Sequence, residues 1–193
     1  MPNKRVKNLT EKILSDNWYT LRKITFDYLM NDGSWQSQER EAYDRGNAAV
    51  ILLYNTELRT VILTKQFRVP TYINGNESGM LIEACAGLLD KDDPEACIIR
   101  ETEEETGYRI GSVKKVFEVY MSPGSVTEKL YFFIAEYSST MKVAEGGGLA
   151  NEQEDIEVLE LTIDQAMQMV EAGEIMDAKT IILLQHVKLK QIL

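Results

Sequence analysis

Two kinds of hydrophobic pattern run along this chain, and together they predict a mixed α/β fold. Nearly continuous apolar runs are typical of strands buried inside a sheet, whereas alternating apolar and polar positions are typical of strands with one exposed face. The predicted strands cover residues 48–54, 61–64, 80–85, 113–121, 129–137 and 156–161. Capping residues and apolar spacing predict helices at about 94–106, from 162 to near 173 and from 177 to about 191. This order indicates a central mixed sheet with helices on both faces.

The N-terminal part of the chain has a pattern of its own. Residues 4–14 are polar and mixed, and we interpret them as a short lead-in. The β-forming runs 18–29 and 35–43 flank Asn31-Asp32-Gly33-Ser34, a strong turn signal, which predicts a hairpin. Because an isolated hairpin is only marginally stable, we expect it to pack on the main domain or on a second subunit. The predicted division is a hairpin and dimerisation segment at 1–45 followed by one domain at 46–193.

Composition and charge narrow the possible classes of protein. With 193 residues, 44% of them hydrophobic, the chain can bury one substantial core. Its 21 basic and 31 acidic residues give a net charge of −10, which argues against nucleic acid or an anionic membrane as a partner. The sequence begins without an apolar leader, and no run approaches the roughly 18 apolar residues of a membrane span. We therefore expect a cytoplasmic protein, with Cys85 and Cys97 reduced and buried.

The helix predicted at 94–106 has clear signals at both ends. Asp93 suits the N-cap, and Pro94 suits the first helical position. Gly107 can adopt the left-handed conformation that ends a helix. Because Ala86-Gly87-Leu88 precedes this helix, a glycine-containing loop leads directly into it.

Three glutamates share one face of this helix, at i, i+3 and i+4: Glu101, Glu104 and Glu105. Cys97 and Ile98 lie on the same stripe one turn earlier, so the carboxylates continue the apolar face. Anions that point inward raise one another's pKa unless cations compensate, and hard divalent cations, Mg²⁺ above all, meet that need with oxygen ligands. Arg100 can also pair with Glu104 at i+4. The alternative interpretation is an acidic helix on the solvent surface.

The spacing of these residues favours the functional interpretation. The stretch resembles the signature box of the Nudix hydrolases, G-x5-E-x7-R-E-U-x-E-E-x-G-U, where U is a bulky apolar residue. The matching positions are Gly87, Arg100, Glu101, Glu104, Glu105 and Gly107, with Tyr108 in the last place. The chain departs from the signature at Asp93, which stands where the first glutamate belongs and is six residues away from Arg100 instead of seven. It departs again at Thr102, which replaces an apolar residue.

The Nudix resemblance implies a fold, a reaction and a metal. It implies an α/β/α sandwich that hydrolyses a nucleoside diphosphate linked to a further group X, with Mg²⁺ as cofactor. The implied metal ligands are the Ala86 carbonyl and the carboxylates of Glu101, Glu104, Glu105 and Glu154. In the family a carboxylate on a later loop commonly binds metal or acts as general base, and the glycine-rich loop 141–155 offers Glu152, Glu154 and Asp155. The resemblance favours Glu154, so the implied catalytic residues are Glu101, Glu105 and Glu154.

The resemblance extends to the GDP-mannose pyrophosphatase branch, which is close to the ADP-ribose pyrophosphatases. It is carried by residues 43–47, 66–69, 75–79, 120–124, 146–148 and 154–158. The branch cleaves a nucleotide sugar between its phosphates, as a homodimer whose N-terminal strands complete the partner's site. We therefore expect a nucleotide-sugar substrate, GDP-mannose first, and a homodimer. Carried over position by position, the substrate-binding residues are Trp18, Glu39, Arg40, Glu41, Arg68, Ala86, Gly87, Leu88, Glu128, Gln153 and Lys179.

Several of these assignments have plainer alternatives. Trp18 can be an ordinary packing residue of the hairpin. Arg40 and Arg68 can be surface charges, although a protein of net charge −10 that binds an anion needs local cations, which favours Arg68. The assignment of Gln153 depends on the loop length, because a slip of two residues would substitute residues 151–152.

The function itself also has two alternatives. One is the same chemistry on ADP-ribose or another ADP-sugar, which the motifs do not separate because base preference depends on hydrogen bonds that they do not encode. The other is a Nudix-fold sensor that binds a nucleotide sugar without hydrolysis. The retained carboxylates argue against the sensor.

Overall fold

The structure is a computed structural model that describes residues 4–89, 93–149 and 153–193. The chain forms two compact units. The first contains the N-terminal segment through Asn47 together with Tyr120–Lys129, and the second contains Ala48–Val119 and Leu130–Leu193. The domain division expected between residues 45 and 46 remains a prediction. No helix in the described residues is long and apolar enough to cross a membrane.

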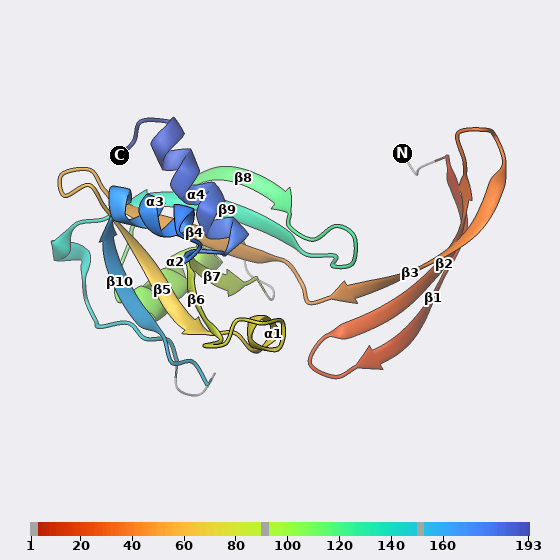
Figure 1. Ribbon diagram of the computed structural model, residues 1–193, viewed down its shortest axis with the longest axis horizontal. Helices are drawn as coiled ribbons and strands as arrows, with labels where there is room; N and C mark the ends of the chain where they lie inside the picture. Colours follow the sequence, from red (N-terminus) through yellow and green to blue (C-terminus); the bar gives the residue numbers. More distant parts are fainter. Residues whose placement is uncertain (1–3, 90–92, 150–152) are drawn as a thin grey trace. The chain divides into compact units, whose positions relative to one another are not determined.

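A mixed β-sheet forms the middle of the second unit (Figure 1). Its strands are β4 Ala48–Asn55, β5 Thr60–Phe67, β6 Met80–Glu83, β7 Cys85–Leu88, β8 Lys114–Tyr120, β9 Lys129–Glu136 and β10 Glu157–Thr162. They run in the order β10-β5-β4-β9-β8, with β6 paired to β5 and β7 paired to β4. Because β4 is parallel to β9 and antiparallel to β5, the predicted mixed sheet is confirmed. The continuous apolar run of β4 is buried on both faces, as expected for a central strand.

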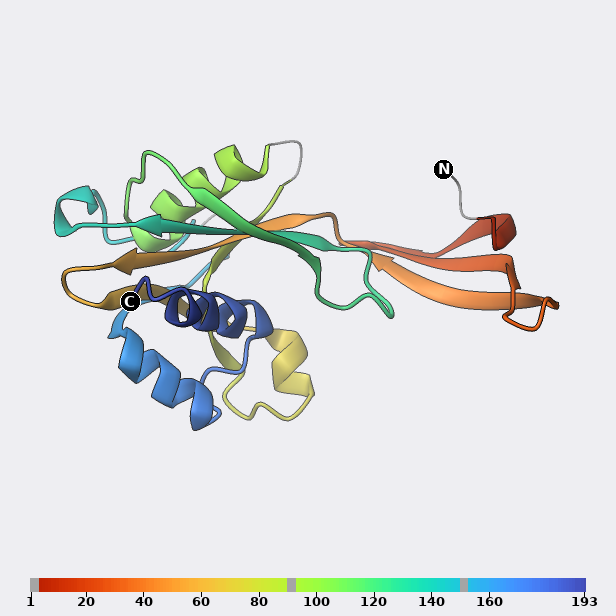
Figure 2. The ribbon, with the colours of Figure 1, turned by 90° about the horizontal axis from the view of Figure 1, so that it is seen from above.

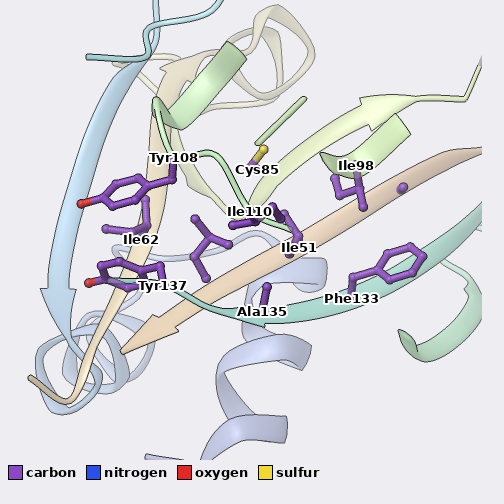
Figure 3. Packing of buried hydrophobic residues seen from close by; sticks show 11 residues of the cluster. Ile51, Ile62, Cys85, Ile98, Tyr108, Ile110, Phe133, Ala135 and Tyr137 are labelled. Atoms are coloured by element: carbon purple, nitrogen blue, oxygen red, sulfur yellow. The ribbon is translucent and has the colours of Figure 1, made fainter. Parts of the chain in front are cut away.

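Helices cover both faces of this sheet (Figure 2). They are α1 Val69–Ile73, α2 Pro94–Thr106, α3 Ile163–Glu171 and α4 Ala178–Leu189, with a short 3-10 helix at Ser139–Met141. The helix α2 packs on one face, against β4 and β7, and α3 and α4 pack on the other. Between α2 and the sheet, buried side chains form a continuous core, to which α2 contributes Ile98 and the sheet contributes residues such as Ile51 and Phe133 (Figure 3). This core fixes the height and rotation of α2 over the sheet.

The capping residues predicted from the sequence are confirmed. The Asp93 side chain caps α2, and Gly107 ends it in the left-handed conformation at φ 77°. Thr162 and Gln165 form the reciprocal capping box of α3. Asp177 caps α4. Local chemistry therefore defines where these three helices start.

The first unit is built on an antiparallel sheet of β1 Val6–Asp16, β2 Thr20–Leu29 and β3 Trp35–Asp44. The hairpin of β2 and β3 confirms the prediction, with Leu29 opposite Trp35 at its turn. The prediction that residues 4–14 are a lead-in was wrong, because most of them form β1. This strand pairs with β2 through its backbone, its register shifts twice, and nearly all of its residues are exposed. Without a buried face, β1 has no hydrophobic period that would predict it.

The strand predicted at 80–85 is divided in two. β6 pairs with β5, the strand is interrupted at Ala84, and β7 pairs with β4 instead. At the break, the Ala84 N–H donates to the Thr180 hydroxyl of α4 at 2.7 Å and makes no sheet hydrogen bond. An apolar run cannot reveal such a change of partner, because all its residues remain buried or half-buried.

Candidate active site

Gly87 brings the backbone of β7 directly against α2. A Cβ built on Gly87 would collide with the Cγ and the carboxyl carbon of Glu101. Only glycine therefore allows the Glu101 side chain to lie across this strand. This close approach is the physical reason for a glycine at the first position of the predicted box.

The glycine-rich loop that follows α2 is fastened to the end of that helix. The N–H of Gly147 donates to the Glu105 carbonyl at 2.9 Å, and the N–H of Gly148 donates to the Glu104 carbonyl at 3.2 Å. Carbonyls in the last turn of a helix have no partner within it, so the loop supplies the missing donors. A Cβ on Gly146 would collide with the backbone of Glu105. The loop is thereby held against the turn that carries the glutamates.

Glu101 is a largely buried carboxylate in a strongly charged environment. Its side chain is 14% exposed and pairs with Arg100 at 2.9 Å. Desolvation raises the pKa of Glu101, the Arg100 charge opposes this, and the neighbouring Glu104 and Glu154 raise the pKa further. At Glu101, the neighbouring carboxylates thus act in the direction expected for anions that face inward.

Glu105 is the most buried of the three glutamates, with 2% of the residue exposed. Its pKa is raised to about 8, and desolvation is the largest cause. A hydrogen bond from the Cys85 thiol opposes that shift, and the charges of Glu154 and Glu101 add to it. In the described structure, the Oε2 atom of Glu105 has no hydrogen-bond partner. A buried carboxylate oxygen without a donor is costly, and a bound cation would compensate it.

Glu104 makes the ion pair predicted for it, with its carboxylate 2.8 Å from Arg100 at i,i+4. Arg100 therefore contacts both Glu104 and Glu101. Among the described residues, no group of three or more His, Cys, Asp or Glu side chains lies close enough together to hold a metal ion in this arrangement. The donor set nevertheless suits a hard cation, because it is anionic, contains only oxygen, and includes the unpartnered Glu105 oxygen.

Glu154 reaches the same cluster from the far end of the glycine-rich loop. Its Oε2 accepts a hydrogen bond from the Leu149 N–H at 3.0 Å. A Cβ on Gly148 would collide with the Glu154 carboxylate, so this loop glycine also permits a close approach. The Glu154 charge acts on both Glu101 and Glu105, whereas Asp155 is exposed to solvent. This geometry favours Glu154 over Asp155 as the loop carboxylate.

Two cations predicted to bind substrate meet at one buried residue. Arg68 and Lys179 both pair with Glu83, a residue that the sequence analysis did not single out. The Arg68 charge also acts on Glu105, where it lowers the pKa. The sequence did contain a signal for Glu83. It is a charged residue in the run Glu-Ala-Cys-Ala-Gly that leads into the box, and a charged residue in an apolar run requires a partner.

Five of the predicted substrate-binding residues belong to the first unit. Trp18 is 83% exposed, and its ring meets the neighbouring Tyr19 ring edge-on at 6.4 Å between centroids, so little of the indole is buried within this unit. Glu39 is exposed as well. Arg40 and Glu41 line a depression of about 620 Å³ formed with residues 120 and 123–127. Glu128 is the most enclosed, with its side chain 12% exposed.

The departures from the signature have local explanations. Thr102 is fully buried, and its hydroxyl donates to the Ile98 carbonyl at 2.6 Å, so the polar atom is satisfied within the helix. Asp93 serves as the helix cap. Gln153 is exposed, with φ 59°, and the alternative positions 151–152 lie outside the described residues.

The glutamate helix, the glycine that it packs against and the mixed sheet between helices are together the features of a Nudix hydrolase. Family models agree with this class. The NUDIX domain matches residues 44–182, and the GDP-mannose pyrophosphatase NudK N-terminal domain matches residues 5–43. The chain therefore belongs to the Nudix family, and its N-terminal unit is of the NudK type.

Curated relatives are similar over nearly the whole chain. A GDP-mannose pyrophosphatase of Escherichia coli strain K12 is 58% identical over 180 residues, which cover 93% of each chain. A GDP-mannose pyrophosphatase of Shigella dysenteriae serotype 1 is 56% identical over 185 residues, which cover 96% of each chain. The similarity thus includes both the N-terminal sheet and the glutamate helix.

Proposed function

We propose that this protein hydrolyses the pyrophosphate bond of a nucleotide sugar, and that GDP-mannose is its preferred substrate. The observation that carries the proposal is that the three helix glutamates of the box, Glu101, Glu104 and Glu105, are present in a chain 58% identical to a GDP-mannose pyrophosphatase. In the reaction, water adds to one phosphorus of the diphosphate, and the bond from that phosphorus to the bridging oxygen breaks. The products are GMP and mannose 1-phosphate.

The proposed cofactor is Mg²⁺. The residues that would hold it are Glu101, Glu104, Glu105 and Glu154, with the Ala86 carbonyl. Glu105 supports this assignment most directly, because its buried Oε2 has no other partner in the described structure. When bound, a divalent cation neutralises phosphoryl charge and lowers the pKa of water.

The protein's own residues have separate roles in this proposal. Arg68 is 41% exposed and offers its guanidinium to a phosphate, because planar paired donors suit phosphate oxygens. Glu154 lies at the carboxylate cluster on a tethered loop, where it can take a proton from the attacking water. Gly87 allows the Glu101 carboxylate to lie directly against the backbone of β7, next to the Ala86 carbonyl that the proposal assigns to the cation.

Product analysis tests the proposal. The protein is incubated separately with GDP-mannose, ADP-ribose and ADP-glucose, each with Mg²⁺ and with a chelator. We expect GMP and mannose 1-phosphate to form fastest, and we expect the chelator to abolish their release. Faster release of AMP would instead favour the ADP-sugar alternative. Ligand binding without metal-dependent turnover of any substrate would contradict hydrolysis and favour the sensor.

We also propose that the protein is a homodimer assembled through its N-terminal sheet. The supporting observation is that this sheet leaves large apolar side chains in solvent: Leu9, Ile13, Leu14, Trp18 and Trp35. Exposed apolar surface of this kind is typical of an interaction site. Sedimentation velocity is expected to show a dimer at assay concentrations, and a fully active monomer would contradict the proposal.

A further inference from the structure

Glu83 is a buried carboxylate that the proposed reaction does not use, and it lies where three elements meet. It is the last residue of β6, and its side chain is 4% exposed. Its Oε2 accepts a hydrogen bond from Arg68 Nε at 2.6 Å, just before α1. Its Oε1 accepts from Lys179 Nζ at 2.5 Å, in the first turn of α4. One carboxylate therefore holds two cations from different parts of the chain.

The charges around Glu83 balance. Lys179 also pairs with Asp177 at 2.8 Å, so two anions face two cations. Burial lowers the pKa of Lys179, but the charges of Glu83 and Asp177 and the hydrogen bonds to them together raise it, and the net shift is upward. The side chains of Glu83, Lys179 and Asp177 are all at least 85% buried, whereas that of Arg68 is 41% exposed. Arg68 is therefore the member of the cluster that a ligand can reach.

The contact with Glu83 uses one nitrogen of the Arg68 guanidinium and leaves the others for a ligand. In the described structure, Nε is the one guanidinium nitrogen of Arg68 that donates a hydrogen bond. Among the described residues, the two terminal nitrogens have no hydrogen-bond acceptor, so they can donate as a pair to a planar or phosphate acceptor. The Arg68 charge also lowers the pKa of Glu105, which places it close to the proposed reaction centre.

We propose that Glu83 is a positioning residue for anion binding. By accepting from Nε, it orients the Arg68 guanidinium so that its terminal nitrogens face the diphosphate, and by pairing with Lys179 it keeps a second cation charged beside it. Preorganising a long side chain removes an ordering cost that binding would otherwise include. This inference rests on the proposed function, because it requires a diphosphate at the carboxylate cluster.

If Glu83 only stabilised the fold, its replacement would have the same effects as replacing another residue that holds this junction together. Thr180 is such a residue and provides the matched control. Thr180 ties the same junction together, because its hydroxyl accepts from the Ala84 N–H at 2.7 Å and donates to Asp177 at 2.6 Å. Replacing Thr180 by valine weakens the connection of β6 to α4 but leaves both contacts of Glu83. A role in stability alone would make the two variants alike.

We expect Glu83→Gln to raise the KM for GDP-mannose about tenfold, with a smaller change in kcat. We expect Thr180→Val to lower the melting temperature and to leave KM unchanged. Initial rates over a range of substrate concentrations, with thermal melts of each variant, measure both quantities. An unchanged KM in Glu83→Gln, or an equal rise of KM in Thr180→Val, would overturn the inference.

Variants of Arg68 separate this inference from the proposed function. If Arg68→Ala leaves KM unchanged, the proposed anion site is itself wrong. If Arg68→Ala raises KM, adding Glu83→Gln to it is expected to have little further effect, because Glu83 acts through Arg68. If the two substitutions instead multiply each other's effects on KM, the positioning role of Glu83 is overturned while the proposed anion site stands.

Arg68→Lys tests the same inference without altering the buried carboxylate. A lysine has one ammonium, which cannot pair with Glu83 and also present two coplanar donors to a phosphate. We therefore expect Arg68→Lys to raise KM nearly as much as Arg68→Ala. A wild-type KM in Arg68→Lys would show that a point charge is sufficient and would contradict positioning by Glu83.

Discussion

Glu105→Gln is expected to lower kcat by about 10²–10⁴-fold while the protein remains folded. Glutamine keeps the shape of the side chain but removes the charge that would hold the proposed cation. We expect no other group to replace the lost charge, because Glu105 is 2% exposed, which keeps water away, and its Oε2 has no other partner in the described structure. Initial rates at saturating Mg²⁺ and GDP-mannose measure the loss. Near wild-type turnover would contradict the metal assignment.

Glu103→Gln is the matched control for this variant. Glu103 is on the same helix, but its side chain is 38% exposed and pairs with Arg109 on the surface. An exposed pair contributes little, so we expect near wild-type activity and stability. A comparable loss of kcat in Glu103→Gln would show that any removed charge on α2 impairs the enzyme.

Although Glu105→Gln is expected to impair catalysis, it is expected to stabilise the metal-free protein. The pKa of Glu105 is about 8 in the fold, above its ordinary value of 4.5. As the pH rises from 4.5 to 8, the unfolded chain loses this proton first, so the stability that the protonated group provides is lost. In chelator at pH 8, Glu105→Gln is therefore expected to melt at a higher temperature than wild type, and the difference should shrink at pH 5.

The helix α2 shows what the sequence alone can predict well. Asp93 and Gly107 define its ends through local hydrogen bonds and backbone conformation, so no knowledge of the fold was required. The spacing of the three glutamates then determined which face they share. Their burial followed from continuity with Cys97 and Ile98, both of which are fully buried.

The features that the sequence did not predict leave no hydrophobic period, and two of them depend on partners far along the chain. β1 is held by pairing with β2 and has almost no buried face. The break at Ala84 depends on Thr180, and the orientation of Arg68 depends on Glu83, which also binds Lys179. Contacts over such separations leave no periodic signal, because each needs only one residue at each end.

The glycine-rich loop is an intermediate case. Its glycines are visible in the sequence, and the structure shows the reason for two of them. Gly146 and Gly148 make room for the Glu105 backbone and for the Glu154 carboxylate, respectively. The resemblance favoured Glu154 among the acidic residues of the loop, but composition alone does not separate it from the adjacent Asp155, because the two positions differ in the direction of their side chains.

Glu154→Gln is expected to lower kcat by about 10²–10⁴-fold, as for removal of a group that takes part in proton transfer. Because the amide can still accept from the Leu149 N–H, the loop is expected to keep its conformation. Asp155→Asn is the matched control, since it removes one charge from the adjacent, exposed position and should retain activity. Steady-state rates of both variants decide the assignment. A large loss in Asp155→Asn with little change in Glu154→Gln would show that the loop turns the other carboxylate toward the substrate.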